Sequence, residues 1–356
     1  MYLMPEDIKK IKVSIPGEKN NLDISQFIEE RNNQIDNIKF FINDDEATDV
    51  DAWFIIEDPY KKCETCNVPP ENVIYFSAEA SYPLGWYDDE KKYNVFFSQF
   101  SKVISCHPIV HKNFEFEPPY LPWAINANHG SFFKKHYRDY DYFKNSKLPS
   151  KKKLLSIICS DQEFTPSHKL RLRFAKELKK HFRDRIDWYG NGINSTSEKW
   201  EALSSYKYSI VLEGQSRNSV ITEKIGDAYL AGTYPIYWGA PDIEKYFPNC
   251  PRQDINIMNL SETIEIIEAV LESKKYENSI SEILKAKDIV LNDFNFIYRF
   301  KKKFEKLKKN LPKSKITVFN RKHFISMAVL PMHKIPINAV GRIFRRIGNG
   351  IIKFSS

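Results

Sequence analysis

The stretch VLEGQSRNSVITEKIGDAYLAGTYPIYWGAPDIEKYF, residues 211–247, changes its hydrophobic pattern twice within a short length. We expect a strand over 208–213, a helix over 222–232 and a second strand over 233–239, because short β-branched and aromatic runs flank a segment with helical spacing. Strands joined through a helix are typical of a parallel sheet with crossover helices. The stretch therefore predicts an α/β domain.

The same alternation extends toward the N-terminus of this stretch. An apolar strand is expected over 151–160, a helix over 168–182, a strand ending in a glycine turn over 185–192 and a further helix over 197–206. The connections are short, as in α/β units with crossover helices. A second domain is therefore expected to begin near Pro149.

Residues 1–145 combine strands with short helices. Strands are expected over 52–58, 72–79 and 102–107, and the segment with Cys63 and Cys66 between the first two is expected to be a surface loop. The proline-rich run EPPYLPW, residues 117–123, is rigid and extended, because proline fixes φ and disfavours helix at the preceding residue. It is expected to begin the passage between domains.

These patterns divide the chain into three parts. The expected parts are a first domain over 1–148, a second domain over 149–312 and a basic amphipathic tail over 313–356. A length of 356 residues suits two domains.

The composition excludes several classes of protein. Apolar residues make up 42% and aromatic residues 14%, which excludes a disordered or collagen-like chain. Five widely spaced cysteines cannot form a disulfide scaffold and suit a reducing compartment. No apolar run is long enough to span a membrane, and no apolar segment follows Lys9, Lys10 and Lys12 as a signal peptide requires. A cytoplasmic protein is the expectation.

The chemistry of 211–247 points to an anion site. Glu213 ends the expected strand, Thr222 is placed to cap the following helix through its hydroxyl, and Glu223 and Lys224 lie in the first turn. Free backbone N–H groups, the helix dipole and Lys224 favour a nucleotide diphosphate at this end of the sheet. The alternative is an ordinary capped helix with a solvated Glu–Lys pair.

The stretch resembles family 10 glycosyltransferases, the α-1,3/1,4-fucosyltransferases. The resemblance is carried by Glu213, ITEKIGDAY (221–229) and PIYWGAPDI (235–243). Weaker similarity lies in PPENVIYFSAE (69–79), YLPW (120–123), HKLRLRFAKEL (168–178) and DWYGNG (187–192). The resemblance implies a GT-B fold, with two Rossmann-like domains facing across a cleft. The first, over 1–148, is then the acceptor-binding domain, and the second, over 149–312, is the nucleotide-sugar donor-binding domain. It also implies inverting transfer of L-fucose from GDP-fucose, without a cofactor or a catalytic metal.

The resemblance also implies roles for individual residues. Lys224 and Arg171 match the family's positions that neutralise charge on the departing GDP, and Glu223 matches the carboxylate that faces the donor sugar. Glu79 matches the acceptor-domain carboxylate that serves as the catalytic base. Arg173, two positions after Arg171, is expected to point elsewhere.

The remaining donor-site candidates are Glu213, Thr222 and Arg217. Arg217 is an extra cation in the loop that either contacts a phosphate or is solvated. Gly214 stands where the family usually has Asn, and Val220 where an aromatic residue is common. These two departures leave the donor sugar open, so a GT-B transferase of another nucleotide sugar is an alternative. A non-enzymatic protein that binds a membrane surface is another.

Basic residues are concentrated at the C-terminus. Residues 301–356 contain 15 Lys and Arg and one acid, so their formal charge is +14 and that of 1–300 is −6. Residues 337–354 have an apolar stripe at helical spacing opposite basic residues, which suits an anionic membrane surface, with a helix packed on the protein body as the alternative. The acidic body disfavours nucleic acid. We therefore expect a peripheral enzyme at the inner face of the cell membrane, acting on an acceptor oligosaccharide or glycolipid such as lipopolysaccharide O-antigen.

Overall fold

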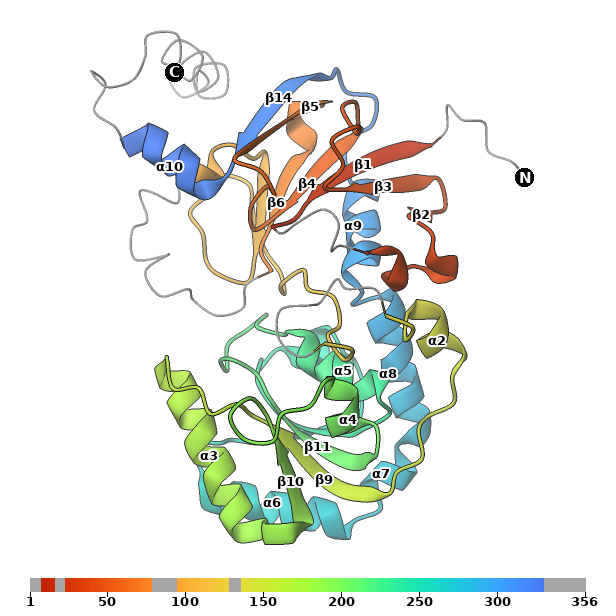
Figure 1. Ribbon diagram of the computed structural model, residues 1–356, viewed down its shortest axis with the longest axis vertical. Coiled ribbons are helices and arrows are strands. Elements are labelled where there is room, and N and C mark those ends of the chain that lie inside the picture. The colour runs from red at the N-terminus through yellow and green to blue at the C-terminus, as the bar shows by residue number, and fades with distance from the viewer. Residues whose placement is uncertain (1–7, 17–22, 79–94, 128–135, 330–356) are drawn as a thin grey trace.

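The computed structural model describes residues 8–16, 23–78, 95–127 and 136–329 (Figure 1). Their fold consists of two α/β units, one above the other in the view of Figure 1, each built on its own sheet. None of the helices in these ranges is long and apolar enough to cross a membrane.

The first unit contains a seven-stranded sheet within the described residues, in the order β2-β3-β1-β4-β6-β7-β8. The strands are β1 (Lys9–Ser14), β2 (Gln34–Ile35), β3 (Ile38–Ile42), β4 (Ala52–Ile56), β6 (Val73–Phe76), β7 (Lys102–Ser105) and β8 (Phe114–Phe116). Every pair is parallel except β2 with β3. Successive β4 residues pack into different clusters, since Phe54 faces one and Trp53 and Ile55 the other. Burial on both faces is what a central strand of a parallel sheet requires.

The second unit contains a five-stranded parallel sheet in the order β10-β9-β11-β12-β13. Its strands are β9 (Lys153–Ile158), β10 (Ile186–Tyr189), β11 (Tyr206–Leu212), β12 (Tyr234–Trp238) and β13 (Gln253–Asp254). The helices around it are α2 (Tyr140–Asn145), α3 (Pro166–Phe182), α4 (Lys199–Leu203), α5 (Glu223–Leu230), α6 (Leu260–Glu272), α7 (Lys275–Asn278) and α8 (Ile280–Asn292). This order is that of a doubly wound sheet.

The predicted α/β architecture of two domains is confirmed. The strands expected over 52–58, 72–79 and 102–107 correspond to β4, β6 and β7, and the helix expected over 168–182 corresponds to α3. The loop after β7 contacts the loop after β11, so the carboxyl ends of the two sheets meet where the units face each other. This is the arrangement that the GT-B prediction describes.

The C-terminal segment returns to the first unit, which corrects the predicted boundaries at 312 and 313. The ring of Phe300 in α9 (Phe296–Glu305) lies 5.2 Å from that of Phe54 and 4.8 Å from that of Phe76. Strand β14 (Ser314–Phe319) pairs antiparallel with β5 (Cys63–Val68), and helix α10 (Arg321–Val329) follows it. The first unit therefore includes residues from both ends of the described chain.

The segment with Cys63 and Cys66 is strand β5, so the prediction of a surface loop there was wrong. Cys66 is 1% exposed and its thiol donates to the Ala47 carbonyl at 3.3 Å. The strand partner of this segment is β14, which lies far away in the sequence. Strands β5 and β14 form a separate two-stranded sheet, and a strand gives a weak local signal in the sequence when its partner is this distant.

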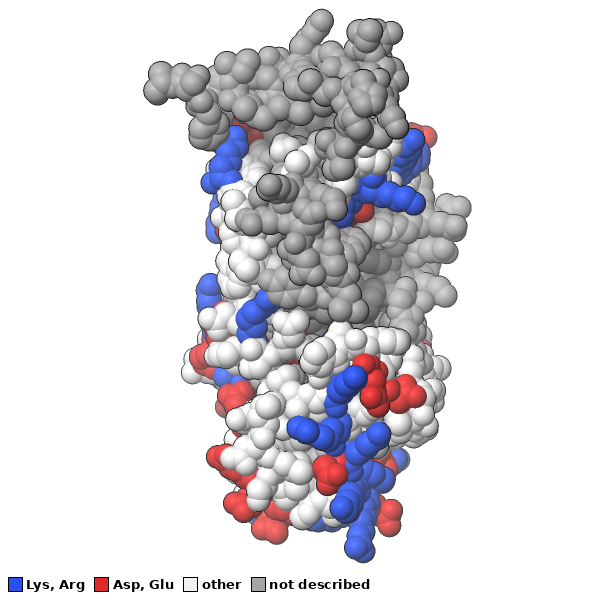
Figure 2. Space-filling view, turned by 90° about the vertical axis from the view of Figure 1, so that its left-hand side faces the viewer, with Lys and Arg blue, Asp and Glu red and all other residues white. Residues whose placement is uncertain are grey.

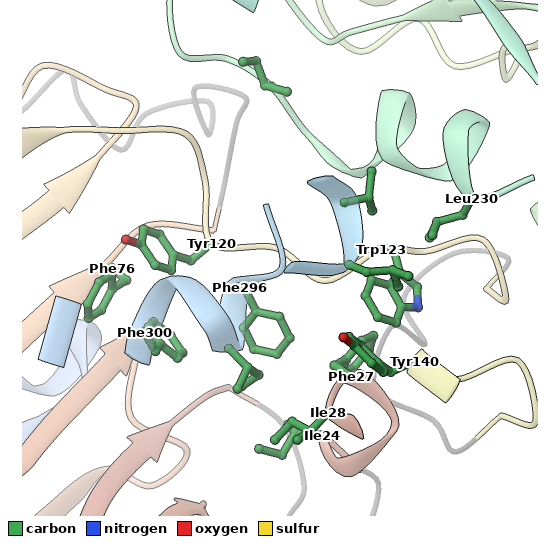
Figure 3. Close-up of a cluster of buried hydrophobic side chains, with 14 of the residues drawn as sticks. Ile24, Phe27, Ile28, Phe76, Tyr120, Trp123, Tyr140, Leu230, Phe296 and Phe300 are labelled. Atoms are coloured by element: carbon green, nitrogen blue, oxygen red, sulfur yellow. The ribbon is translucent and has the colours of Figure 1, made fainter. Parts of the chain in front are cut away.

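A cluster of buried apolar side chains joins the two units (Figure 3). Trp123 lies in the passage predicted over 117–123, and its ring centroid is 4.8 Å from that of Phe27 and 6.0 Å from that of Phe143. Leu230 of α5 belongs to the same cluster as Phe300 of α9. The apolar contact between the units is continuous with the core of each.

Candidate functional site

The topology of the second sheet has a switch point at the ends of β9 and β11. These strands are neighbours, but the connection from β9 leads through α3 to β10 on one side, and that from β11 leads through α5 to β12 on the other. Ligands of open α/β sheets bind outside the carboxyl ends of the strands at such a switch point. The candidate donor residues lie on the two segments that border it.

Glu213 and Thr222 lie at this switch point, between the end of β11 and the start of α5. Glu213 is fully buried, and its two carboxylate oxygens accept from the Thr222 N–H at 2.9 Å and the Thr222 hydroxyl at 2.6 Å. Burial raises the pKa of the Glu213 carboxyl, while Lys224 and Thr222 oppose that shift. The Thr222 hydroxyl therefore holds Glu213 and makes no capping bond to α5, which corrects its expected role as a helix cap.

Glu223 is held by a cation that sequence reasoning missed. The Lys199 ammonium lies 2.7 Å from Glu223 Oε1 and 3.1 Å from Asp227 Oδ2. Burial disfavours ionised Glu223, but Lys199 and Lys224 more than offset it and hold the pKa of this carboxyl below its usual range. For Asp227, burial dominates and raises the pKa to about 6. Glu223 is therefore the member of the acid pair that is held as a carboxylate.

Lys224 of α5 and Arg171 of α3 supply positive charge near the same switch point. The Lys224 ammonium lies 3.8 Å from Glu213 Oε2 and 3.4 Å from Glu223 Oε1, and its side chain remains 34% exposed. Burial lowers the pKa of Arg171, an effect opposed by Cys159 and Glu213. Burial and the cations Arg171 and Lys224 all lower the pKa of His168. The two cations that the resemblance assigns to GDP thus lie on α3 and α5, the helices that follow the neighbouring strands β9 and β11.

Arg171 and Arg173 point to different sides of α3, as predicted. The buried Nε of Arg171 makes no hydrogen bond within the described residues, whereas Arg173 is exposed. Figure 2 shows Lys and Arg side chains gathered on the face of the second unit that carries α3. The exposed basic residues of this helix are Lys169, Arg173, Lys176 and Lys180. Arg173 is therefore a suitable control for Arg171.

The glycines near Glu213 differ in the space around them. A Cβ on Gly239 would lie 2.2 Å from the Tyr237 hydroxyl and 2.6 Å from Cγ of Glu213, so only glycine fits there. A Cβ on Gly214 would meet no atom of the described chain within 4 Å. The structure leaves room beside Gly214, one of the two positions at which the sequence departs from the family pattern.

Arg217 joins the two units. Its Nη2 lies 2.7 Å from His107 Nδ1 and donates to the Cys106 carbonyl at 3.3 Å. His107 is fully buried at the end of β7 in the first unit. The alternative that Arg217 is simply solvated is therefore wrong, and this contact fixes the loop after β11 against the opposite sheet.

The predicted base Glu79 lies outside the described residues, as do residues 337–354. The structure describes β6 and the two residues after it, Ser77 and Ala78, which lead directly to Glu79. Val220, the other departure from the family pattern, is fully buried with Cys106. Within the described ranges, no group of three or more His, Cys, Asp or Glu side chains could hold a metal ion.

Comparisons with known proteins single out the second unit. Residues 148–283 match the family model described as glycosyltransferase family 10 (fucosyltransferase) C-term. Alpha-(1,3)-fucosyltransferase FucT of Helicobacter pylori is 32% identical over 90 residues, which cover 25% of this chain and 18% of that protein. Alpha-(1,3)-fucosyltransferase B of Drosophila melanogaster is 28% identical over 124 residues, which cover 30% of this chain and 28% of that protein. The chain thus spans less than a third of the length of either relative.

A solved structure of an alpha1,3-fucosyltransferase is also similar. It shares 18% identity, with a TM-score of 0.46 over 80% of this chain and 83% of that chain. The family match covers β9 to β13, and so includes Arg171, Glu213, Glu223 and Lys224. The second α/β unit of this chain, which contains the matched residues 148–283, is therefore similar to the C-terminal domain of family 10 glycosyltransferases.

Proposed function

We propose that this chain transfers L-fucose from GDP-fucose to a hydroxyl of an acceptor glycan, in α-1,3 or α-1,4 linkage, with inversion and without a catalytic metal. The observation that carries the proposal is the geometry at the switch point of the unit that matches family 10. There α3, which carries Arg171, contacts the loop after β11 through Ser167 and Gly214. Lys224 lies 3.8 Å from Glu213 Oε2. A diphosphate is the anionic part of GDP-fucose, and the start of α5 offers backbone N–H groups beside these cations.

The charges of the site suit the two halves of the reaction. Cleavage of the sugar–phosphate bond leaves negative charge on GDP, which Arg171 and Lys224 are placed to neutralise. Positive charge develops on the fucose ring, and Glu223, kept ionised by Lys199, is the carboxylate assigned to face it. Inversion requires a base on the acceptor side, and we assign this role to Glu79.

We further propose that the acceptor is a cell-surface glycan built at a membrane, such as lipopolysaccharide O-antigen. The support is the formal charge of +14 over residues 301–356, which favours an anionic lipid surface. Such a location places the enzyme at the inner face of the cell membrane. The binding partners proposed are accordingly GDP-sugar, a glycan or glycolipid acceptor, and the membrane surface.

GDP and GDP-fucose are expected to stabilise the protein against heat in the presence of EDTA. A ligand that binds only the native state at 100 times its Kd adds about 2.7 kcal/mol to the free energy of unfolding. Thermal unfolding should be measured with GDP, with UDP as the control, and fucose transfer with and without EDTA. Loss of turnover in EDTA and its recovery with Mn²⁺ would contradict the metal-free mechanism.

Lys224→Ala and Arg171→Ala are each expected to weaken GDP binding by about ten- to a hundredfold. Loss of a charge-assisted hydrogen bond costs about 1.5–3 kcal/mol. Calorimetry with GDP should measure the change, and Arg173→Ala is the matched control because it removes the same group from the exposed side of α3. Equal effects at positions 171 and 173 would refute the assignment.

Transfer of a different sugar from a nucleotide sugar is the second candidate function. The observation that favours it is the space beside Gly214, where a Cβ would meet no described atom within 4 Å and the family usually has Asn. Hydrolysis of a panel of nucleotide sugars by the purified protein distinguishes the two functions. A preference for a donor other than GDP-fucose that Gly214→Asn shifts toward GDP-fucose would support this alternative.

A further inference from the structure

Glu57 adopts a backbone conformation that is energetically unfavourable for glutamate. It follows the last residue of β4 and has a φ of 59°, in the left-handed region. This region costs a residue other than glycine about 1–2 kcal/mol. The surroundings of Glu57 must therefore hold it in place, and a residue retained in a strained conformation invites a functional explanation.

The Glu57 carboxylate accepts hydrogen bonds from residues at the end of β6. Its Oε1 accepts from the Ser77 hydroxyl at 2.9 Å and from the Ala78 N–H at 2.7 Å, and its Oε2 accepts from the Tyr75 hydroxyl at 3.0 Å. The Glu57 N–H in turn donates to the Phe76 carbonyl at 3.0 Å. One side chain thus fixes the direction in which the chain leaves β6.

Arg321 supplies the positive charge that keeps this carboxylate in place. It is the first residue of α10 and its side chain is 7% exposed. Its Nη2 lies 3.1 Å from Glu57 Oε2 and also donates to the Glu57 carbonyl at 3.1 Å, while its backbone N–H donates to Asp58 Oδ1 at 2.8 Å. A guanidinium is suited to this position because several donors lie in one plane.

Pairing of β14 with β5 places Arg321 beside Glu57, although the two residues lie far apart in the sequence. Phe319, the last residue of β14, pairs with Cys63, and the Asn320 N–H donates to the Lys62 carbonyl at 2.9 Å. The next residue is Arg321. The register of the edge strand therefore determines which residue of the C-terminal segment reaches Glu57.

We propose that Arg321 is a positioning residue for the transfer reaction: through Glu57 it holds Ser77 and Ala78, and thereby the point from which the chain continues to Glu79. The proposal rests on the proposed function, because it gives Glu79 the role of base. It assigns a task in catalysis to a residue at the opposite end of the chain. A misplacement of about 1 Å can cost about a hundredfold in rate, so firm placement of the preceding residues matters.

Arg321→Gln tests the proposal by separating catalysis from stability. We expect kcat to fall by about 10- to 100-fold, with little change in the KM for GDP-fucose, and amide hydrogen exchange at Ala78 to accelerate. Arg321→Lys should recover part of the rate, because lysine keeps the charge but donates from a single nitrogen. Ser77→Ala removes one Glu57 contact with little risk to folding, and should also lower kcat.

Arg252→Gln is the matched control. Arg252 is likewise mostly buried and paired with two carboxylates, Glu244 and Asp254, but lies in the second unit. After correction for the folded fraction, an equal kcat in the Arg321 and Arg252 variants would overturn the proposal and leave Arg321 a purely structural residue. Unchanged exchange at Ala78 in Arg321→Gln would overturn it as well.

A double variant distinguishes failure of this proposal from failure of the proposed base. If Arg321 acts through Glu79, Arg321→Gln should add little to the loss caused by Glu79→Gln. Full activity of Glu79→Gln alone refutes Glu79 as the base, and a multiplicative loss in the double variant refutes the route through Glu79. If the wild-type protein does not use GDP-fucose, exchange at Ala78 still decides whether Arg321 holds the strand end.

Discussion

Glu79→Gln is expected to lower kcat by about 10²–10⁴ while the affinity for GDP stays near that of the wild type. Glutamine keeps the size of the side chain but cannot accept the proton of the acceptor hydroxyl. Donor affinity should persist because Arg171 and Lys224 lie in the other unit. Steady-state transfer assays and calorimetry with GDP measure the two quantities.

Glu71→Gln provides the control for this experiment. Glu71 is an exposed glutamate just before β6, so the substitution makes the same chemical change at the opposite end of the same strand. Its kcat should equal that of the wild type. Full activity of Glu79→Gln would direct the search to other carboxylates near the ends of the first sheet.

Truncation after Lys313 is expected to unfold the first unit or to lower its stability by several kcal/mol. It removes β14, in which Val318 is fully buried with Trp53 and Tyr75, and full burial of a valine-sized side chain contributes about 1.5–3 kcal/mol. It also leaves Glu57 without Arg321. These losses are comparable with the total stability of a typical domain, about 5–15 kcal/mol. Denaturant unfolding should measure the change.

Truncation after Val329 is the matched comparison, because it keeps β14 and α10. This shorter deletion should leave the protein folded and active but abolish most of its sedimentation with anionic vesicles, since each basic residue near such a surface contributes about 1 kcal/mol. Binding of the full chain should weaken in high salt. Unfolding of the shorter deletion, or undiminished vesicle binding, would contradict the assignment of membrane contact to residues 330–356.

The strands that the sequence predicted are those with a strong local pattern of apolar residues. Strands β4 and β6 are short apolar runs buried on both faces, so their composition alone identifies them. By contrast, β1 carries three lysines, and the charge of its buried Lys12 is compensated by Glu64 of β5 at 3.5 Å. Strand β14 lies in a lysine-rich run and depends on pairing with β5. Contacts between residues so far apart produce no periodic hydrophobic pattern in the sequence.

The candidate site was likewise predictable only where its residues lie close together in the sequence. Glu213, Glu223 and Lys224 lie in one stretch of sequence, and their chemistry could be inferred from the end of a strand and the start of a helix. Lys199 was missed because it lies in a helix of ordinary appearance, 24 residues before its partner Glu223. The partner of Arg217 is His107, in the other unit. Only the three-dimensional fold reveals such pairs.

The return of β14 and α10 to the first unit affects the order in which the polypeptide can mature. All of the second unit lies between α2 and α8, so its residues leave the ribosome before the first unit has received its last strand. Domains generally fold as units during synthesis, and here the N-terminal unit can be completed only after the inserted one. Until Arg321 emerges, nascent chains expose the edge of β5 and lack the partner of Glu57. A newly made molecule therefore acquires the support for its proposed acceptor side last.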